Sequence, residues 1–218
     1  MKLVVIAIDG PAGSGKSTVA RALAGALGWS YLDTGLMYRK LTADLIDREL
    51  DSSDSRIVTQ VAHSIDFRSF ISRSESDMPS LDRLRHQDVN ALVHSIAALA
   101  DVRQEFARRQ RELVFAWGGR AVVEGRDTGS VVFPEAIVKV FLTASLEERA
   151  RRRVHEGIES ISARDNADTK RVISPLEISG SSLVIDTTDV AVEKICLEIL
   201  AAALNVAVDE VTHVDAFE

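Results

Sequence analysis

The segment AIDGPAGSGKSTVA, residues 7–20, constrains the fold of this chain more than any other. It contains the phosphate-loop pattern, in which a glycine, four residues and Gly-Lys-Ser follow a strand and open a helix. The pattern is formed by Gly10, Gly15, Lys16 and Ser17. An apolar run, residues 2–8, precedes it, and an Ala- and Leu-rich stretch follows it. The sequence therefore predicts a strand, a phosphate-binding loop and a helix that together bind a nucleoside triphosphate.

Each residue type in this loop has a physical role. Glycines at positions 10, 13 and 15 let the backbone turn tightly, so that successive N–H groups face one phosphate. Lys16 would bridge the β- and γ-phosphates, and the Ser17 hydroxyl would hold Mg²⁺. The predicted ATP-binding residues of the loop are Gly10, Pro11, Ala12, Gly13, Ser14, Gly15, Lys16, Ser17 and Thr18.

Short apolar runs alternate with helical patterns along most of the chain. Strands are predicted within residues 2–8, 29–33, 118–125, 137–144 and 182–188. Helices are predicted over residues 16–27, from Asp33 to about Arg48, twice between Gln87 and Leu113, and over about 189–204. A further helix opens at a capping box of Ser145 and Glu148. This alternation predicts an α/β fold, a three-layer P-loop NTPase core with a five-stranded parallel sheet.

The domain organisation follows from changes in composition. We expect one domain over residues 1–204, with a core of residues 1–49 and 86–204, an inserted lobe at about 50–85 and a short lid at about 154–168. The insert is polar and Ser-rich, with one strand expected in SIDFRSFI, residues 64–71. A Ser-rich surface linker without function is an equally good interpretation of this composition. Residues 205–218 are predicted to form an acidic tail or linker.

Composition excludes several classes of protein. The 218 residues carry a net charge of −7, which argues against a general binder of nucleic acid or of membrane surfaces. No apolar stretch is long enough to span a membrane. The single cysteine, Cys196, rules out a disulfide within the chain and fits a reducing cytoplasm.

Arginines are concentrated in an otherwise acidic chain. Arg126 follows the third predicted strand, Arg39 lies in the helix after the second, and the segments 149–157 and 163–176 are rich in arginine. The planar guanidinium group suits phosphate because it donates two parallel hydrogen bonds and keeps its charge. Each arginine taken singly is more often a solvated surface charge. Their convergence favours a second phosphorylated ligand, held by Arg39 and Arg126.

A set of motifs resembles the bacterial cytidylate kinases, nucleoside monophosphate kinases that make CDP or dCDP. The motifs are IDGPAGSGKST, LDTGLMYR, RHQDV, SIAALADVR, RRQRE, EGRDTGSVVFP, LTASLEERARRR, RDNAD, SPL and DTT. The resemblance extends to about Leu204 and implies phosphoryl transfer from ATP to CMP or dCMP. Separately, we expect a cytoplasmic enzyme that acts as a monomer. The insert would then be the NMP-binding lobe, with Arg85 closing it over the base.

The resemblance also implies residue roles. Ser95, Arg103 and Asp127 would read cytosine, and Asp127 would reject uracil, which presents an acceptor instead of an amine. The CMP-binding set is Thr34, Arg39, Ser95, Arg103, Arg126, Asp127, Arg164, Asp168 and Arg171. Asp168 would bind the sugar, or equally would only steady Arg164. Arg149 and Arg153 would reach ATP, and Asp33 and Glu124 would hold waters of Mg²⁺. The catalytic set is Lys16, Arg126, Arg153, Arg164 and Arg171.

The chain departs from the family pattern in a short lid and in Asp101, which stands where many members have proline. A short lid predicts some wasteful ATP hydrolysis. Two other functions stay open. One is a kinase on the same core that acts on AMP or on a phosphorylated metabolite. The other is a switch that binds ATP or GTP without transfer, although an Asn-Lys-x-Asp guanine signature is absent.

Overall fold

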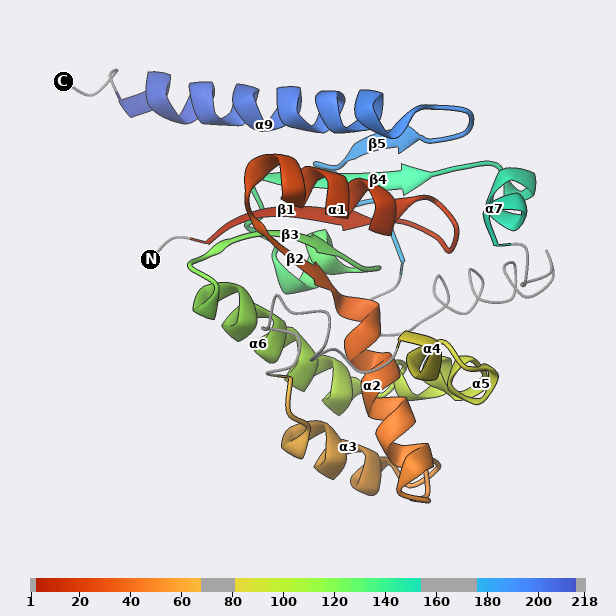
Figure 1. Ribbon diagram of the computed structural model, residues 1–218. Coiled ribbons are helices and arrows are strands. Elements are labelled where there is room, and N and C mark those ends of the chain that lie inside the picture. Colours follow the sequence, from red (N-terminus) through yellow and green to blue (C-terminus); the bar gives the residue numbers. More distant parts are fainter. Residues whose placement is uncertain (1–2, 68–80, 154–175, 215–218) are drawn as a thin grey trace.

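The fold is built on a five-stranded parallel sheet (Figure 1). The computed structural model describes residues 3–67, 81–153 and 176–214. The strands are β1 (Val4–Asp9), β2 (Ser30–Asp33), β3 (Arg120–Glu124), β4 (Val138–Thr143) and β5 (Leu183–Asp186), in the order β2-β3-β1-β4-β5. All four pairings are parallel, which confirms the predicted α/β architecture. Because β1 is central, the loop that follows it lies between the ends of β3 and β4.

Helices cover both faces of the sheet (Figure 1). One face packs on α1 (Lys16–Leu27) and α9 (Val192–Val214), and the other packs on α2 (Thr34–Asp47) and α6 (Ala100–Ala116). The side chains of β1 alternate between these layers, since Val5 joins the core on the α2 and α6 side and Ile6 joins the core on the α1 and α9 side. Both faces of the central strands β1 and β3 are therefore buried, as their apolar sequences require.

The shorter helices are α3 (Ser55–Ser64), α4 (Leu81–Leu84), α5 (Gln87–Ile96) and α7 (Leu146–Arg152), together with a π-helical turn at Thr128–Val132. Helix α7 begins as predicted, because the Ser145 hydroxyl accepts a hydrogen bond of 3.2 Å from the Glu148 N–H. The carboxylate of Glu148 does not complete the capping box. It binds Arg151 and Arg152 instead.

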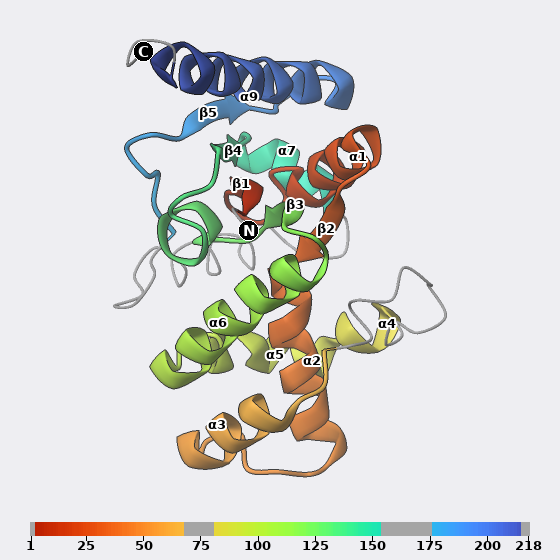
Figure 2. The ribbon, with the colours of Figure 1, turned by 90° about the vertical axis from the view of Figure 1, so that its left-hand side faces the viewer.

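The segment after α2 differs from the prediction. Residues 55–64 form α3, and Ile65–Phe67 follow it without a strand, whereas residues 68–71 of the predicted strand lie outside the described residues. Val58, Val61 and Ala62 are buried and recur at helical spacing, so α3 packs its apolar face against the core. Both views show α3 farther from the sheet than α6 (Figures 1 and 2). The predicted division into core and insert remains a prediction.

The final helix is longer than predicted. α9 continues past Leu204 to Val214, so most of the predicted tail is helical and only residues 215–218 lie outside the described part. The prediction ended the helix where the resemblance ended, although no Gly or Pro interrupts the sequence there.

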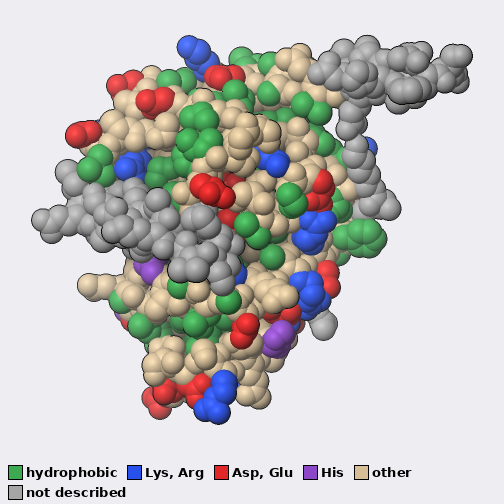
Figure 3. Space-filling model, turned by 180° about the vertical axis from the view of Figure 1, so that it is seen from behind, with side chains coloured by type: hydrophobic (Ala, Val, Ile, Leu, Met, Phe, Trp, Pro, Cys, Tyr) green, Lys and Arg blue, Asp and Glu red, His purple; other side chains and the backbone are tan. Residues whose placement is uncertain are grey.

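Acidic and basic side chains are interspersed among the described residues on the face drawn in Figure 3. Among the described helices, none combines the length and the apolar character that crossing a bilayer requires.

A buried carboxylate joins α3 to α6. Glu105 is 7% exposed and accepts hydrogen bonds from Arg108 Nη2 at 2.7 Å and from Arg109 Nε at 2.6 Å. Arg109 also donates to the backbone oxygens of His63 and Ile65, which lie at the end of α3. The hydrogen bonds from Arg108 and then from Arg109 lower the pKa of Glu105 from 4.5 to about 2.

We expect the Glu105→Gln substitution to lower the free energy of unfolding at pH 7 by about 1–3 kcal/mol, because a charge-assisted network is lost. Since the folded pKa is lowered, this stabilisation is complete above pH 4.5 and is lost as the pH falls toward 2. Urea unfolding at pH 7, 4 and 3 measures the difference in unfolding free energy between the wild type and the variant. The control is Glu112→Gln, which removes a 60% exposed partner of the same Arg108. Equal losses of unfolding free energy in the two variants would contradict the stabilising role given to the buried Glu105 network.

Candidate active site

The loop between β1 and α1 has the conformation that phosphate binding requires. Gly10 and Gly13 have φ angles of 148° and 78°, in which other residues are strained. A Cβ atom at Gly10 would lie 2.1 Å from the Leu142 carbonyl oxygen, and one at Gly13 would lie 2.8 Å from that of Arg149. Only glycine therefore lets the loop approach β4 and α7 this closely. Pro11 and Ala12 lie in the loop, and Thr18 lies in the first turn of α1.

The polar groups of this loop are suited to an anion. Lys16 Nζ donates a hydrogen bond of 2.8 Å to the Pro11 carbonyl oxygen. Burial lowers the pKa of Lys16 from 10.5 to about 7, the charge of Arg126 adds to this shift, and Glu124 opposes it. Within the described residues the buried Ser14 hydroxyl has no hydrogen-bond partner. A phosphate would supply both a counter-charge for Lys16 and an acceptor for Ser14.

Oxygen ligands gather beside the loop at the ends of β2 and β3. Ser17 Oγ donates to Glu124 Oε2 at 3.0 Å, and the Tyr31 hydroxyl donates to Glu124 Oε1. Burial, and then the nearby charge of Glu124, raises the pKa of Asp33 to about 6. Burial also raises the pKa of Tyr31, so its hydroxyl stays a donor. A hydroxyl and two carboxylates are the hard ligands that a hydrated divalent cation prefers, so these residues fit such an ion.

A buried ion pair lies between α6 and the segment after β3. Arg103 is 5% exposed and donates to Asp127 Oδ2, while its Nη1 atom donates to the Ala97 carbonyl oxygen at 2.9 Å. Asp127 is 8% exposed. The structure brings together these two of the three predicted cytosine-binding residues. The third, Ser95, is exposed and donates to the Leu92 carbonyl oxygen of its own helix.

The two arginines predicted to hold a monophosphate contact different elements. Arg126 donates to the Gly10 carbonyl oxygen and so contacts the phosphate loop. Arg39 Nη1 donates to the Leu84 carbonyl oxygen at 3.0 Å and to Asn90 Oδ1 at 2.7 Å, next to α4 and α5. Their joint role therefore stays a prediction. Thr34, also in the predicted set, donates from Oγ1 to the Glu124 carbonyl oxygen at 2.8 Å.

The sequence placed Asp9 at a strand end, as it did Asp33 and Glu124, but gave it no role; in the structure it connects the phosphate loop to the segment after β3. Its carboxylate accepts from the N–H and Oγ1 of Thr128 at 2.9 and 2.7 Å, and from the Gly129 N–H at 2.8 Å. Burial raises its pKa, and these hydrogen bonds oppose the rise. Asp9 directly precedes the phosphate loop, and Thr128 directly follows Asp127. Its position at a strand end was the signal for a place near the ligands, but its partners Thr128 and Gly129 were not predicted.

Helix α7 and its C-terminal flank present the predicted ATP-contacting arginines. Arg149 donates to the carbonyl oxygens of Ala144 at 3.2 Å and Ala12 at 3.3 Å, so it lies against the phosphate loop. The charge of Arg153 contributes to the lowered pKa of Lys16. Arg164, Asp168, Arg171 and the predicted lid lie outside the described residues.

A phosphate loop after a central parallel strand, with oxygen ligands at the neighbouring strand ends and arginines around them, defines a P-loop phosphotransferase. Comparison with known proteins then gives the family. The family model "Cytidylate kinase" matches residues 6–205, and the chain belongs to this family.

Relatives that are named as cytidylate kinases are similar in sequence to most of this chain. A cytidylate kinase of Carboxydothermus hydrogenoformans is 40% identical over 214 residues, which covers 89% of this chain and 95% of the relative. One from Caldanaerobacter subterraneus is 40% identical over 205 residues, which covers 88% of this chain and 91% of the relative. A crystal structure of an uncharacterized protein from Eubacterium ventriosum has the same fold, with a TM-score of 0.51 at 14% sequence identity. The match covers 92% of this chain and 98% of that protein.

Proposed function

We propose that the protein transfers the γ-phosphoryl group of ATP to CMP or dCMP, giving ADP and CDP or dCDP. The observation that best supports this function is the buried ion pair between Arg103 and Asp127. Asp127 directly follows Arg126, and Arg126 contacts the phosphate loop. A group that selects a base and a group that contacts the donor loop are thus neighbours in the chain. This arrangement suits a transfer from one nucleotide to another.

Base selection follows from hydrogen-bonding chemistry. The exocyclic amine of cytosine is a donor, and the carboxylate of Asp127 is an acceptor. Uracil presents a carbonyl oxygen at the same position and would face that carboxylate unfavourably. Arg103 orients the carboxylate of Asp127 through their ion pair, and Ser95 would contact the base after turning its hydroxyl away from its own helix.

The reaction needs no general base, because the attacking phosphate oxygen of the acceptor is already anionic at neutral pH. Catalysis is then alignment plus neutralisation of charge on the transferred group. Lys16, Arg126 and Arg153 provide charge from the described part of the chain, and Arg164 and Arg171 are proposed to add theirs. Arg39 would hold the acceptor phosphate, and Arg149 would hold ATP.

Mg²⁺ is proposed as the cofactor, with Ser17 as direct ligand and with Asp33 and Glu124 acting through water. When bound, Mg²⁺ neutralises charge on the β- and γ-phosphate oxygens of ATP. We also propose that the enzyme acts as a monomer in the cytoplasm, with an NMP-binding lobe at about residues 50–85 and a lid at about 154–168.

Measuring ADP production with ATP, Mg²⁺ and each of CMP, dCMP, UMP, AMP and GMP tests this function. We expect turnover with CMP and dCMP that exceeds turnover with the other acceptors by at least about 10²-fold, the scale that one mismatched buried polar contact produces. Preference for AMP would indicate the alternative kinase. ADP production that no acceptor increases would indicate a nucleotide-binding protein without transfer.

A further inference from the structure

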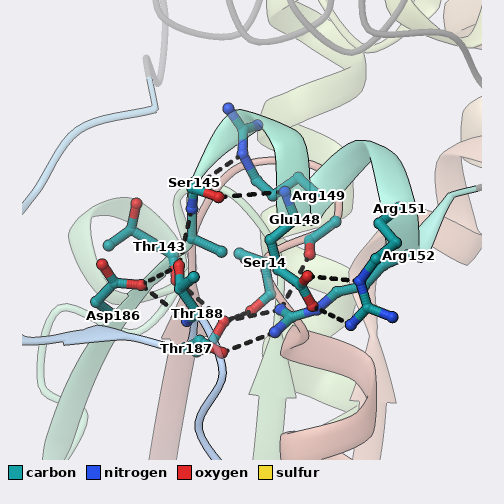
Figure 4. Close-up of polar contacts among 12 residues, drawn as sticks. Ser14, Thr143, Ser145, Glu148, Arg149, Arg151, Arg152, Asp186, Thr187 and Thr188 are labelled. Carbon is teal, nitrogen blue, oxygen red and sulfur yellow. Dashed lines mark hydrogen bonds and ion pairs between the residues drawn. The ribbon is translucent and has the colours of Figure 1, made fainter.

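A hydrogen-bond network joins the loop after β5 to the outer side of the phosphate loop (Figure 4). Thr187, which follows β5, is 1% exposed, and its Oγ1 lies 3.1 Å from the carbonyl oxygens of both Ser14 and Thr143. The hydroxyl hydrogen is therefore shared between the phosphate loop and β4. The Thr187 N–H also donates to the Thr143 carbonyl oxygen at 2.8 Å, which fixes the backbone of Thr187 on the sheet.

Arg152 of α7 completes the network. Its Nη1 donates to Thr187 Oγ1 at 2.8 Å and to the Gly13 carbonyl oxygen at 3.4 Å, and its Nη2 donates to the Thr187 carbonyl oxygen at 2.7 Å. Glu148 accepts from Arg152 Nε at 2.7 Å and holds the guanidinium in place (Figure 4). A Cβ atom at Gly15 would lie 3.5 Å from Arg152 Nη1. The arginine thus lies directly against the phosphate loop.

The direction of these contacts determines the direction of the loop N–H groups. In a planar trans peptide the carbonyl oxygen of one residue and the N–H of the next point in opposite directions. Thr187 holds the Ser14 carbonyl oxygen from outside the loop, so the Gly15 N–H points toward the inside, where a phosphate binds. Arg152 also joins α7 to this loop, and Arg149 of the same helix donates to the Ala12 carbonyl oxygen of the loop.

We infer that Thr187 and Arg152 are positioning residues for the triphosphate, which orient the Ser14–Gly15 peptide before ATP arrives. The inference rests on the proposed function only in taking the loop as the ATP site. Within the described residues, neither side chain contacts a residue of the proposed acceptor site, so we expect their effect to be on ATP and not on CMP.

The hydroxyl of Thr187 is tested by comparing Thr187→Val with Thr187→Ser. Calorimetry measures the Kd for ATP with Mg²⁺ and no acceptor, and kinetics measure the KM values for ATP and CMP. We expect Thr187→Val to raise the Kd and KM for ATP about tenfold, as loss of one oriented hydrogen bond implies, and to leave the KM for CMP within about twofold. Thr187→Ser keeps the hydroxyl and restores most of the affinity. Equal behaviour of the two variants would overturn the inference.

The matched control is Thr188→Val, the same change one residue later. The Thr188 hydroxyl donates to Asp186 Oδ1 at 2.6 Å and accepts from the Ser145 N–H at 2.9 Å, without reaching the phosphate loop. We expect its Kd for ATP to stay within about twofold of the wild type. An equal rise in the Thr188 variant would mean that the loop after β5 acts through general stability, and the inference would fail.

Two arginines of α7 allow a second comparison if the Thr187 variants fold poorly. Arg151 and Arg152 both bind Glu148, but Arg151 is 74% exposed and Arg152 alone of the two reaches the loop. Arg152→Gln should raise the Kd for ATP about tenfold and Arg151→Gln less than about twofold. Combined with Thr187→Val, Arg152→Gln should be less than additive, because both substitutions break one contact. Full additivity, or equal effects of the two arginine variants, would contradict the inference.

These outcomes separate the two proposals. A wild-type protein that binds ATP and phosphorylates no nucleotide would overturn the proposed function and still allow the binding comparison. A wild-type protein that phosphorylates CMP, with a Thr187→Val variant that binds ATP equally well, would overturn only the positioning role.

Discussion

Lys16→Met is expected to lower kcat/KM for phosphoryl transfer by at least about 10³-fold, the scale found when a charge that stabilises the transition state is removed. The substituted side chain has similar length but no charge for the transferred group. Lys16 donates a hydrogen bond to the Pro11 carbonyl oxygen, so the loop itself already orients the amine group of Lys16. Steady-state ADP production measures the loss.

A matched control is Lys194→Met, which makes the same change at an exposed position of α9. Its rate should stay within about twofold of the wild type. A Lys16→Met variant that folds normally and keeps more than about a tenth of the activity would contradict the role given to Lys16.

Asp127→Asn is expected to lower the ratio of kcat/KM for CMP to that for UMP by about 10²-fold. The amide keeps the shape of the carboxylate but can donate to the uracil carbonyl oxygen. Activity with CMP should also fall, because the substitution removes the charge that faces buried Arg103. Parallel assays with CMP and UMP measure the ratio directly.

The control for this substitution is Glu135→Gln, which removes the charged partner of Arg111 in an ion pair at the surface. The CMP-to-UMP ratio should not change there. If Asp127→Asn lowers activity with both acceptors equally and leaves the ratio unchanged, Asp127 supports the fold without reading the base.

The sequence predicted the five strands and the phosphate loop well because both depend on local patterns. Short apolar runs that alternate with helical patterns form the parallel strands, and Gly-Lys-Ser directly after such a run indicates a phosphate loop. Helix α3 was not predicted, since Ser-rich neighbours concealed the helical spacing of Val58, Val61 and Ala62.

Contacts between distant segments were beyond sequence reasoning. Asp9 binds Thr128, 119 residues away, and Thr187 lies 173 residues from its partner Ser14. Local propensity does not encode such pairs, although Asp9 at the end of β1 and Thr187 directly after β5 lie at the edge of the sheet where ligands bind. The DTT segment that contains Thr187 contributed to the resemblance, but nothing in the sequence predicted its contact with the phosphate loop.

The most direct test of the central claim is product stoichiometry. Purified protein is incubated with ATP, CMP and Mg²⁺, and chromatography measures CDP and ADP while free phosphate is measured in parallel. Phosphoryl transfer predicts CDP and ADP in nearly equal amounts, with a small surplus of ADP and phosphate if the proposed lid admits water. ADP that appears with an equal amount of free phosphate, without CDP and at the same rate whether or not CMP is present, would contradict the account.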